Sequence, residues 1–353
     1  MKVGPQSAGA TPGPACYRRG GEEPCVTDAN IVLGKLNQKK ILGGRMEIDL
    51  SLAEKAIREK ICERSGLTLA EAASGIISVV NSNMMRAIRI VSVERGYDVR
   101  DFALMAFGGA GPLHACEVAE ELGIRRVLIP PSPGTLCSLG LLMADTKFDL
   151  SRSRIMLAKE ENLPDVNAVL QEMIDEGNEL LDREKIPAYR RTFLAGVDAR
   201  YERQNYEINV KLEGTEITPE RLAAALKQFH IQHERSFGYC NESFNVQFVN
   251  FRLSAVGEID KPALTAEPDS PGAVLPAPAE IRGVLFVSEK EYIRTPVYQR
   301  EAFVPGLTAR GPMIIEQMDC TTVIPPNWNI KVDGYRNIHA DLMGGAGDGE
   351  EEL

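Results

Sequence analysis

The fold of this chain is decided by residues 102–131, which read FALMAFGGAGPLHACEVAEELGIRRVLIPP. Short apolar runs at residues 102–107 and 126–129 predict two β-strands. Between them, a glycine-rich turn leads into a helical segment at residues 113–122, and Pro112 is suited to the first turn of that helix. Glycines allow a backbone to approach a ligand closely. The order strand, glycine turn, helix, strand therefore predicts a β-α-β unit of a kind that suits a nucleotide site.

The glycine turn does not match the dinucleotide-binding fingerprint. A G-x-G-x-x-G pattern through Gly109 and Gly111 would need a glycine at position 114, where the chain has His114. An acidic residue at the end of a second strand, about twenty positions further on, is also missing. From its residues, the turn is open to two interpretations, a nucleotide-binding loop or a tight structural turn.

Composition places the chain among ordinary globular proteins. Its 353 residues can bury a sizeable core and predict about two domains, and 44% of them are hydrophobic and 25% charged. The net charge of -10 argues against a nucleic-acid partner. The N-terminus lacks the basic and apolar segments of a secretion signal, and we find no run of about 18 apolar residues to span a bilayer. We therefore expect a cytoplasmic protein with neither nucleic acid nor a membrane as partner.

Cysteines and histidines give no catalytic or metal-binding pattern. The seven cysteines show no C-x-x-C spacing, which favours reduced thiols over disulfides or a zinc site. Cys16 and Cys25 have no histidine near them in sequence, so neither is predicted as a nucleophile. His230 and His233 lie three positions apart on a predicted helix with Glu234 beside them, but a third ligand is not evident. We predict no metal site and identify no catalytic residue.

Several further segments carry a family resemblance. Residues 4–17 read GPQSAGATPGPACY, a loop rich in glycine and proline without any charge, and TDAN follows at 27–30. The resemblance continues at residues 108–114, 130–140, 200–204, 233–239 and 311–328. Together these segments resemble the ATP-dependent hydantoinase A family, which includes N-methylhydantoinase and 5-oxoprolinase A-type subunits and the acetone carboxylase β subunit. The resemblance covers nearly the whole chain.

The resemblance implies an α/β fold. The family looks related to the actin, sugar kinase and Hsp70 superfamily of ATPases. We expect residues 1–150 to form the C-terminal portion of an ATPase-like domain and residues 151–340 to form a β-rich α+β domain, with the boundary near a composition shift at residues 151–154. A proline- and alanine-rich connection at residues 262–278 is expected to be mobile. The glycine-rich acidic tail, residues 341–353, is expected to be disordered.

The resemblance also implies which residues meet the cofactor. In the superfamily a Gly-Gly turn closes over the adenosine of ATP, which here would involve Gly108, Gly109, Gly111, Pro112 and His114. His114 is either a direct ligand or a histidine packed against the turn. Asp28 either acts near phosphate or Mg²⁺ or forms an ordinary helix cap. Asn81 and Asn83, in a long predicted helix, either touch a ligand or are ordinary polar positions.

By resemblance, the complete enzyme uses ATP and a divalent cation, Mg or Mn, to phosphorylate a carbonyl oxygen and open a cyclic amide such as a hydantoin or 5-oxoproline. The alternatives are a subunit of an ATP-dependent ketone carboxylase and a non-catalytic scaffold subunit. A sugar-kinase-like phosphotransferase is disfavoured because we identify no aspartate base in a glycine-rich sugar loop.

The resemblance also implies partner proteins. The Asp-x-Gly-Gly-Thr loops that hold phosphate in this superfamily do not occur in the sequence. We therefore expect the chain to correspond to the C-terminal half, with an N-terminal hydantoinase A-type half or subunit and a hydantoinase B-type subunit as partners. A split gene and a truncated remnant remain alternative explanations.

Overall fold

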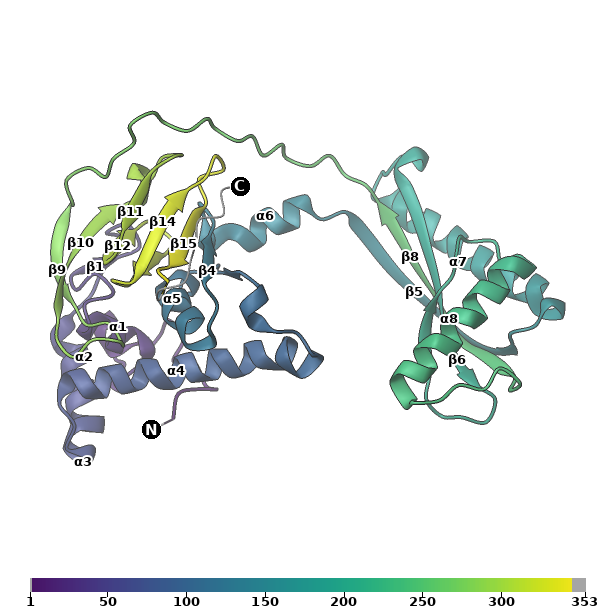
Figure 1. The fold of residues 1–353 in the computed structure, drawn as a ribbon, viewed down its shortest axis with the longest axis horizontal. Coiled ribbons are helices and arrows are strands. Elements are labelled where there is room, and N and C mark those ends of the chain that lie inside the picture. The colour runs from purple at the N-terminus through teal and green to yellow at the C-terminus, as the bar shows by residue number, and fades with distance from the viewer. Residues whose placement is uncertain (1, 345–353) are drawn as a thin grey trace. The chain divides into compact units, whose positions relative to one another are not determined.

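The computed structural model describes residues 2–344, and the chain divides into two compact units (Figure 1). Unit 1 holds Met1–Gly140 together with Ala263–Leu353, and unit 2 holds Leu141–Pro262. Both units combine helices with β-sheets, so the expected α/β class is confirmed. The two units are described separately below.

Helices form the N-terminal part of unit 1. They are α1 (Val26–Val32), α2 (Leu50–Ile57), α3 (Glu63–Ser65) and α4 (Leu69–Val91), and a π-helical turn joins α2 to α3. The sequence predicts capping boxes at Ser51 and at Thr68, and a helix end at Gly66. Thr68 and Glu71 do form a capping box that opens α4, and Gly66 ends α3 in a left-handed conformation. The predicted box at Ser51 is wrong, because the side chain of Asp49 caps α2 instead. Buried alanine and isoleucine side chains of α1, α2 and α4 form one core cluster.

The predicted β-α-β unit is present. It consists of β3 (Leu104–Met105), α5 (Gly111–Leu122) and β4 (Arg126–Ile129), with the two strands paired in parallel. The C-terminal strands β14 (Trp328–Val332) and β15 (Ile338–Leu342), with β11 (Thr308–Arg310), complete the sheet in the order β11-β14-β15-β4-β3. Segments about 200 positions apart in the sequence therefore share one sheet.

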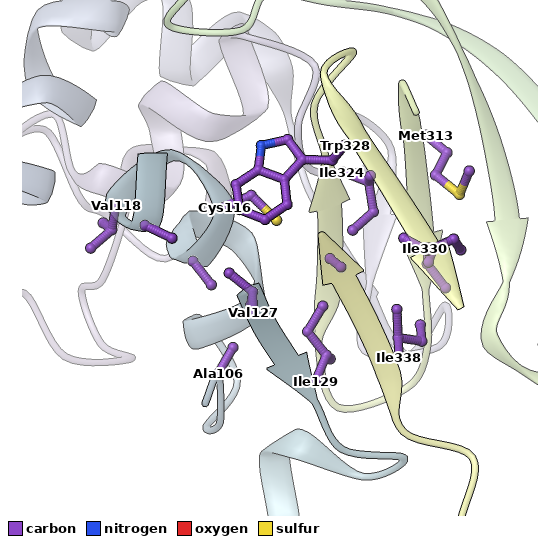
Figure 2. Close-up of a cluster of buried hydrophobic side chains, with 14 of the residues drawn as sticks. Ala106, Cys116, Val118, Val127, Ile129, Met313, Ile324, Trp328, Ile330 and Ile338 are labelled. Atoms are coloured by element: carbon purple, nitrogen blue, oxygen red, sulfur yellow. The ribbon is translucent and has the colours of Figure 1, made fainter. Parts of the chain in front are cut away.

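A second sheet of unit 1 faces the same core. Its order is β13-β12-β10-β9, from β9 (Glu280–Val284), β10 (Ile293–Gln299), β12 (Met313–Glu316) and β13 (Thr321–Ile324). A small hairpin, β1 (Lys40–Ile41) and β2 (Met46–Glu47), stands apart. Figure 2 shows the fully buried indole of Trp328 beside Cys116 of α5 and Ile324 of β13. Helix α5 thus packs among β13, β4 and α4, which fixes the position of its first turn.

Unit 2 is an antiparallel sheet with two long helices. Strands β5 (Thr146–Leu157), β6 (Arg191–Tyr201), β7 (Ile208–Lys211) and β8 (Val246–Gly257) are ordered β5-β8-β6-β7. Helices α7 (Leu163–Arg183) and α8 (Pro219–Phe237) pack against the sheet, and one helix, α6 (Leu136–Met143), spans the division between the units. Alternate side chains of β8 are buried, as expected of a sheet with one covered face.

The division differs from the boundary expected near residue 151. That position lies within β5, where the polar composition reflects the exposed side chains of a strand rather than a linker. The segment expected as one domain, residues 151–340, is shared between the units because β9 to β15 return to the sheets of unit 1. Of the expected tail, Asp341 and Leu342 belong to β15, and residues 345–353 lie outside the described residues.

The connection at residues 262–278 is more ordered than its composition indicates. The backbone N–H of Glu267 donates to the carbonyl of Gly334 at 2.8 Å, and that of Ser270 donates to Pro305 at 2.9 Å. The Glu267 carboxylate also pairs with Arg336 at 2.9 Å. These contacts hold the segment against unit 1.

One apolar helix, residues 69–95, is long enough to cross a bilayer by length and composition. Core helices of soluble proteins meet the same criteria. Its first half supplies Ala72, Ala73, Ile76 and Ile77 to the core that it shares with α1 and α2.

Candidate functional site

The glycine turn lies at the carboxyl ends of β3 and β4, where open α/β sheets bind ligands. Gly108 has a φ of +80°, a conformation that favours glycine, and its N–H donates to the carbonyl of Pro133 at 2.7 Å. A Cβ atom at Gly108 would meet no atom within 4 Å. The backbone conformation therefore favours glycine at this position, while the space beside it stays open.

Helix α5 begins directly after the turn. Gly111 is its first residue and Pro112, which is buried, occupies the first turn. The first turn carries no acidic side chain, so the helix dipole presents positive charge at this end. The start of α5 thus brings together four of the residues that the sequence predicted for the site, Gly108, Gly109, Gly111 and Pro112.

The hairpin between β12 and β13 forms the opposite wall of the turn. The Asp319 carboxylate accepts from the N–H of Gly134 at 2.9 Å and from the amide of Gln317 at 2.6 Å. The same amide donates to the carbonyl of Pro131 at 3.2 Å, and the carbonyl of Asp319 lies 3.3 Å from an ideal Cβ position on Gly109. Sequence reasoning did not single out Gln317 or Asp319, because the pairing joins segments about 185 positions apart.

His114 lies on α5 and is 5% exposed. Its Nδ1 lies 3.0 Å from the side-chain oxygen of Asn81, which can only accept, so Nδ1 carries the proton and donates. Burial, reinforced by the positive charge of Lys35 and opposed by Glu117, lowers the pKa of His114 to about 4. The imidazole is therefore neutral at pH 7.

Asn81 also connects His114 with a buried ion pair, Lys35 and Glu117, that the sequence analysis did not identify. Lys35 is fully buried, and its Nζ lies 2.6 Å from the Glu117 carboxylate. That carboxylate also accepts from the N–H of Val287 at 3.2 Å and from the amide of Asn81 at 3.4 Å. The network joins the end of α1, α4, α5 and the segment after β9, and it fixes the helix that carries the glycine turn.

The lowered pKa of His114 predicts a pH dependence of stability. An unfolded histidine binds a proton with a pKa of about 6.5, whereas folded His114 does so near pH 4. The unfolded state therefore binds more protons between these values, and the free energy of unfolding falls as the pH drops from 6.5 toward 4. Urea unfolding of the wild type and of His114→Gln at pH 7, 5.5 and 4.5 tests this. We expect a shallower fall in the variant; parallel profiles would contradict it.

Asp28 is a buried cap. Its carboxylate accepts from the N–H groups of Cys16 and Cys25, each at 2.8 Å, and of Ala15 at 3.2 Å. Both oxygens are thus engaged by the loop before α1, and none of these hydrogen bonds reaches the glycine turn. The geometry agrees with the helix-cap interpretation of Asp28.

The other candidates have structural partners. Burial raises the pKa of Cys16 and of Cys25, which keeps both as thiols. His230 lies 2.7 Å from the Tyr201 hydroxyl, and Nδ1 of His233 lies 2.7 Å from the carbonyl of Tyr239. Within residues 2–344 there is no group of three His, Cys, Asp or Glu side chains that could hold a metal ion.

Two hollows lie away from the glycine turn. One, of about 480 Å³, lies at the starts of β3 and β4 and is lined by Phe102, Arg126 and Asp341 among others. The other, of about 560 Å³, lies on the sheet of unit 2 beside Gly196 and Arg252. The turn itself is an open surface.

Comparison with known proteins identifies relatives along the chain. The Hydantoinase/oxoprolinase family matches residues 1–150, and the Hydantoinase/oxoprolinase C-terminal domain matches residues 156–342. An uncharacterised protein of Methanocaldococcus jannaschii is 39% identical over 95% of this chain and 47% of its own length. The caprolactamase subunit alpha of Pseudomonas jessenii is 36% identical over 94% of this chain and 48% of its own length.

Solved structures agree with these matches. The crystal structure of the ATP-dependent caprolactamase from Pseudomonas jessenii has a TM-score of 0.79 and 35% identity, covering 96% of this chain and 50% of that one. A nucleotide-free structure of acetone carboxylase has a TM-score of 0.82 at 24% identity, covering 97% and 50%, and supports the fold. The chain spans about half the length of the curated relatives it matches. From its first helices to its last strand, the chain belongs to the hydantoinase/oxoprolinase family.

Proposed function

We propose that this chain forms the nucleoside-binding side of an ATP-dependent enzyme that opens a cyclic amide. The observation that carries the proposal is the glycine turn, which is open beside Gly108 and leads into the positive first turn of α5. The relatives support the chemistry, since the caprolactamase subunit alpha is 36% identical and a caprolactamase of known structure is ATP-dependent. Gly108, Gly109 and Gly111 would line the nucleoside.

Each part of the turn has a physical task. Glycine leaves room for a ribose or base to approach the backbone, and the positive end of the α5 dipole would orient an anionic group beside it. Pro112 would fix the start of the helix. His114 is neutral and hydrogen-bonded to Asn81, so it would support the turn by packing rather than by charge.

ATP would supply the activation that the substrate lacks. An amide carbonyl is a poor electrophile, and phosphorylating its oxygen creates a better leaving group. A divalent cation, Mg or Mn, would accompany the phosphates; its ligands belong, in our proposal, to the phosphate-binding half of the enzyme. We propose two partners. One is the phosphate-binding half, which comes from the same polypeptide or from a separate one, and the other is a hydantoinase B-type subunit. We place the enzyme in the cytoplasm.

The second candidate is a subunit of an ATP-dependent ketone carboxylase. The acetone carboxylase beta subunit of Xanthobacter autotrophicus is 27% identical over 96% of this chain, which is less than the caprolactamase identity. The third candidate function is a scaffold role without nucleotide binding. Purifying the native complex and measuring ATP consumption with lactams, hydantoins, or ketones plus bicarbonate separates the three.

The glycine turn gives a direct test of nucleotide binding. In Gly108→Asn, the amide side chain enters the open space beside the turn, while asparagine tolerates the positive φ at a cost of about 1 kcal/mol. We expect adenine nucleotides to bind at least about tenfold more weakly, which corresponds to about 1.4 kcal/mol. Isothermal titration calorimetry with the wild type and the variant measures the change.

Gly96→Asn is the matched control. Gly96 has a φ of +84° and, like Gly108, open space at its Cβ position, but it ends the helical segment after α4. We expect the same small loss of stability and unchanged nucleotide affinity. If Gly108→Asn and Gly96→Asn bind adenine nucleotides with equal affinity, the turn does not bind the nucleoside.

A further inference from the structure

Strand β3 leaves one edge of the five-stranded sheet open. In the order β11-β14-β15-β4-β3 it is the last strand, and it pairs with β4. The N–H of Ala106, directly after β3, donates to the carbonyl of Leu128 in β4 at 2.8 Å. Because N–H groups alternate in direction along an extended segment, those of residues 103, 105 and 107 point away from β4. Among residues 2–344, no strand pairs with β3 on that side.

The side chains at this edge are apolar and exposed. Leu104 packs against the core, whereas Met105 and Phe107, which alternate with it, are 48% and 50% exposed. Phe102 is also exposed, and its ring centroid lies 6.0 Å from that of exposed Tyr97 in an edge-to-face arrangement. We call these four exposed side chains, Tyr97, Phe102, Met105 and Phe107, the β3 patch.

Other sheet edges of unit 1 are protected in the ways that proteins normally use, which are polar side chains and cover by another segment. At the opposite end of the same sheet, β11 carries the exposed polar residues Thr308 and Arg310. On the second sheet, the N–H of Leu285, directly after the edge strand β9, donates to the carbonyl of Leu33 at 2.9 Å, so the segment after α1 adjoins that edge. By contrast, residues 102–107 include no charged side chain.

A lipid surface is a poor match for this edge. The helical segment at residues 69–95 ends with the exposed side chains of Ile90, Val91 and Val93, which a membrane would accept. Lipid tails, however, offer no acceptor to the outward N–H groups of residues 103, 105 and 107, and unpaired backbone groups are costly there. A protein strand provides both acceptors for the N–H groups and apolar contacts for the β3 patch.

We propose that the β3 edge binds a β-strand of the phosphate-binding half of the enzyme, which extends the sheet beyond β3. The inference rests on the proposed function and adds where and how that half attaches. The chain covers 47% and 48% of two curated relatives and 50% of the caprolactamase of known structure, so each of them has a further segment of about equal size. Backbone hydrogen bonds would hold the incoming strand, and Met105 and Phe107 would pack against the segment that carries it.

Photo-crosslinking from the edge tests the proposal. Phe107→p-benzoylphenylalanine keeps an aromatic side chain at an exposed position, and the assembled enzyme is irradiated in its own host before purification. We expect mass spectrometry to find a crosslink to a segment of a hydantoinase A-type half that carries an Asp-x-Gly-Gly-Thr loop. Ile281→p-benzoylphenylalanine is the matched control, because Ile281 is 52% exposed on the edge strand β9. We expect no crosslink from Ile281 to that half.

Amide hydrogen exchange of residues 102–107 in the assembled enzyme is the second measurement. Met105→Lys changes an exposed side chain, so the chain should keep its fold, but it places a charge where the incoming strand packs. We expect exchange in this segment to become at least about tenfold faster, because the strand is held more weakly. Ile281→Lys, the same change on β9, should leave that exchange as in the wild type.

Each other outcome contradicts the inference. A crosslink from Phe107 to lipid or to a second copy of this chain would identify a different occupant of the edge. If the phosphate-binding half is present in the enzyme but does not crosslink from Phe107, the proposed function stands and the inference fails. If no such half is present, both fail. Unchanged exchange in Met105→Lys would also refute the inference, and if that variant does not fold, the crosslink alone decides.

Discussion

Replacing Lys35 by methionine is expected to lower the free energy of unfolding by about 3–5 kcal/mol. The substitution keeps most of the side-chain volume but leaves the Glu117 carboxylate buried without its cation. Breaking a buried pair from one side is costly because the remaining charge is neither solvated nor paired. Urea denaturation followed by circular dichroism measures the change.

Two comparisons separate the buried charge from ordinary loss of a side chain. The double variant Lys35→Met with Glu117→Gln should recover at least half of the loss, because the neutral amide still accepts from Val287. Lys60→Met removes a pair of nearly the same length, 2.7 Å to Glu23, from the surface and should have little effect. Equal losses in Lys35→Met and Lys60→Met would refute the account of the network.

Replacing Asp28 by alanine is expected to cost about 3 kcal/mol or more. The change leaves the N–H groups of Ala15, Cys16 and Cys25 without an acceptor, and the first two are in a buried environment. Unpaired buried donors each carry a desolvation penalty of about 1–3 kcal/mol. Thermal and urea unfolding of the variant measure the loss.

The exposed cap Asp49 is the control for Asp28. Its side chain accepts from the N–H of Ser51 at the start of α2, so Asp49→Ala should cost only about 1 kcal/mol. If Asp28→Ala is no worse than Asp49→Ala, then Asp28 is not the anchor of the loop. A stable Asp28→Ala variant that had lost nucleotide binding would instead favour the other interpretation of Asp28, a role near phosphate.

Local features of the fold were predictable from the sequence. The β-α-β unit, the capping box at Thr68 and the helix end at Gly66 depend on residues close in sequence, and the structure contains all three. The domain division was not predictable in this way. Pairing of β15 with β4 joins segments about 200 positions apart, and hydrophobic periodicity carries no information about such partners.

In the candidate site, too, the local features were predictable from the sequence and the long-range contacts were not. The glycine turn is a local signal, so Gly108 was found. Lys35 and Glu117 look like surface residues in sequence, and only the packing of α1 against α4 and of α4 against α5 buries them together.

The central claim is that the glycine turn binds the ATP used to open a cyclic amide. Its most direct test is ADP release by the assembled enzyme, purified around this chain, on addition of lactams and hydantoins. We predict that at least one cyclic amide stimulates ADP release, that Gly108→Asn raises the ATP concentration needed for this stimulation at least about tenfold, and that Gly96→Asn leaves it unchanged. Stimulation by no cyclic amide, or an unchanged ATP requirement in Gly108→Asn, would contradict the claim.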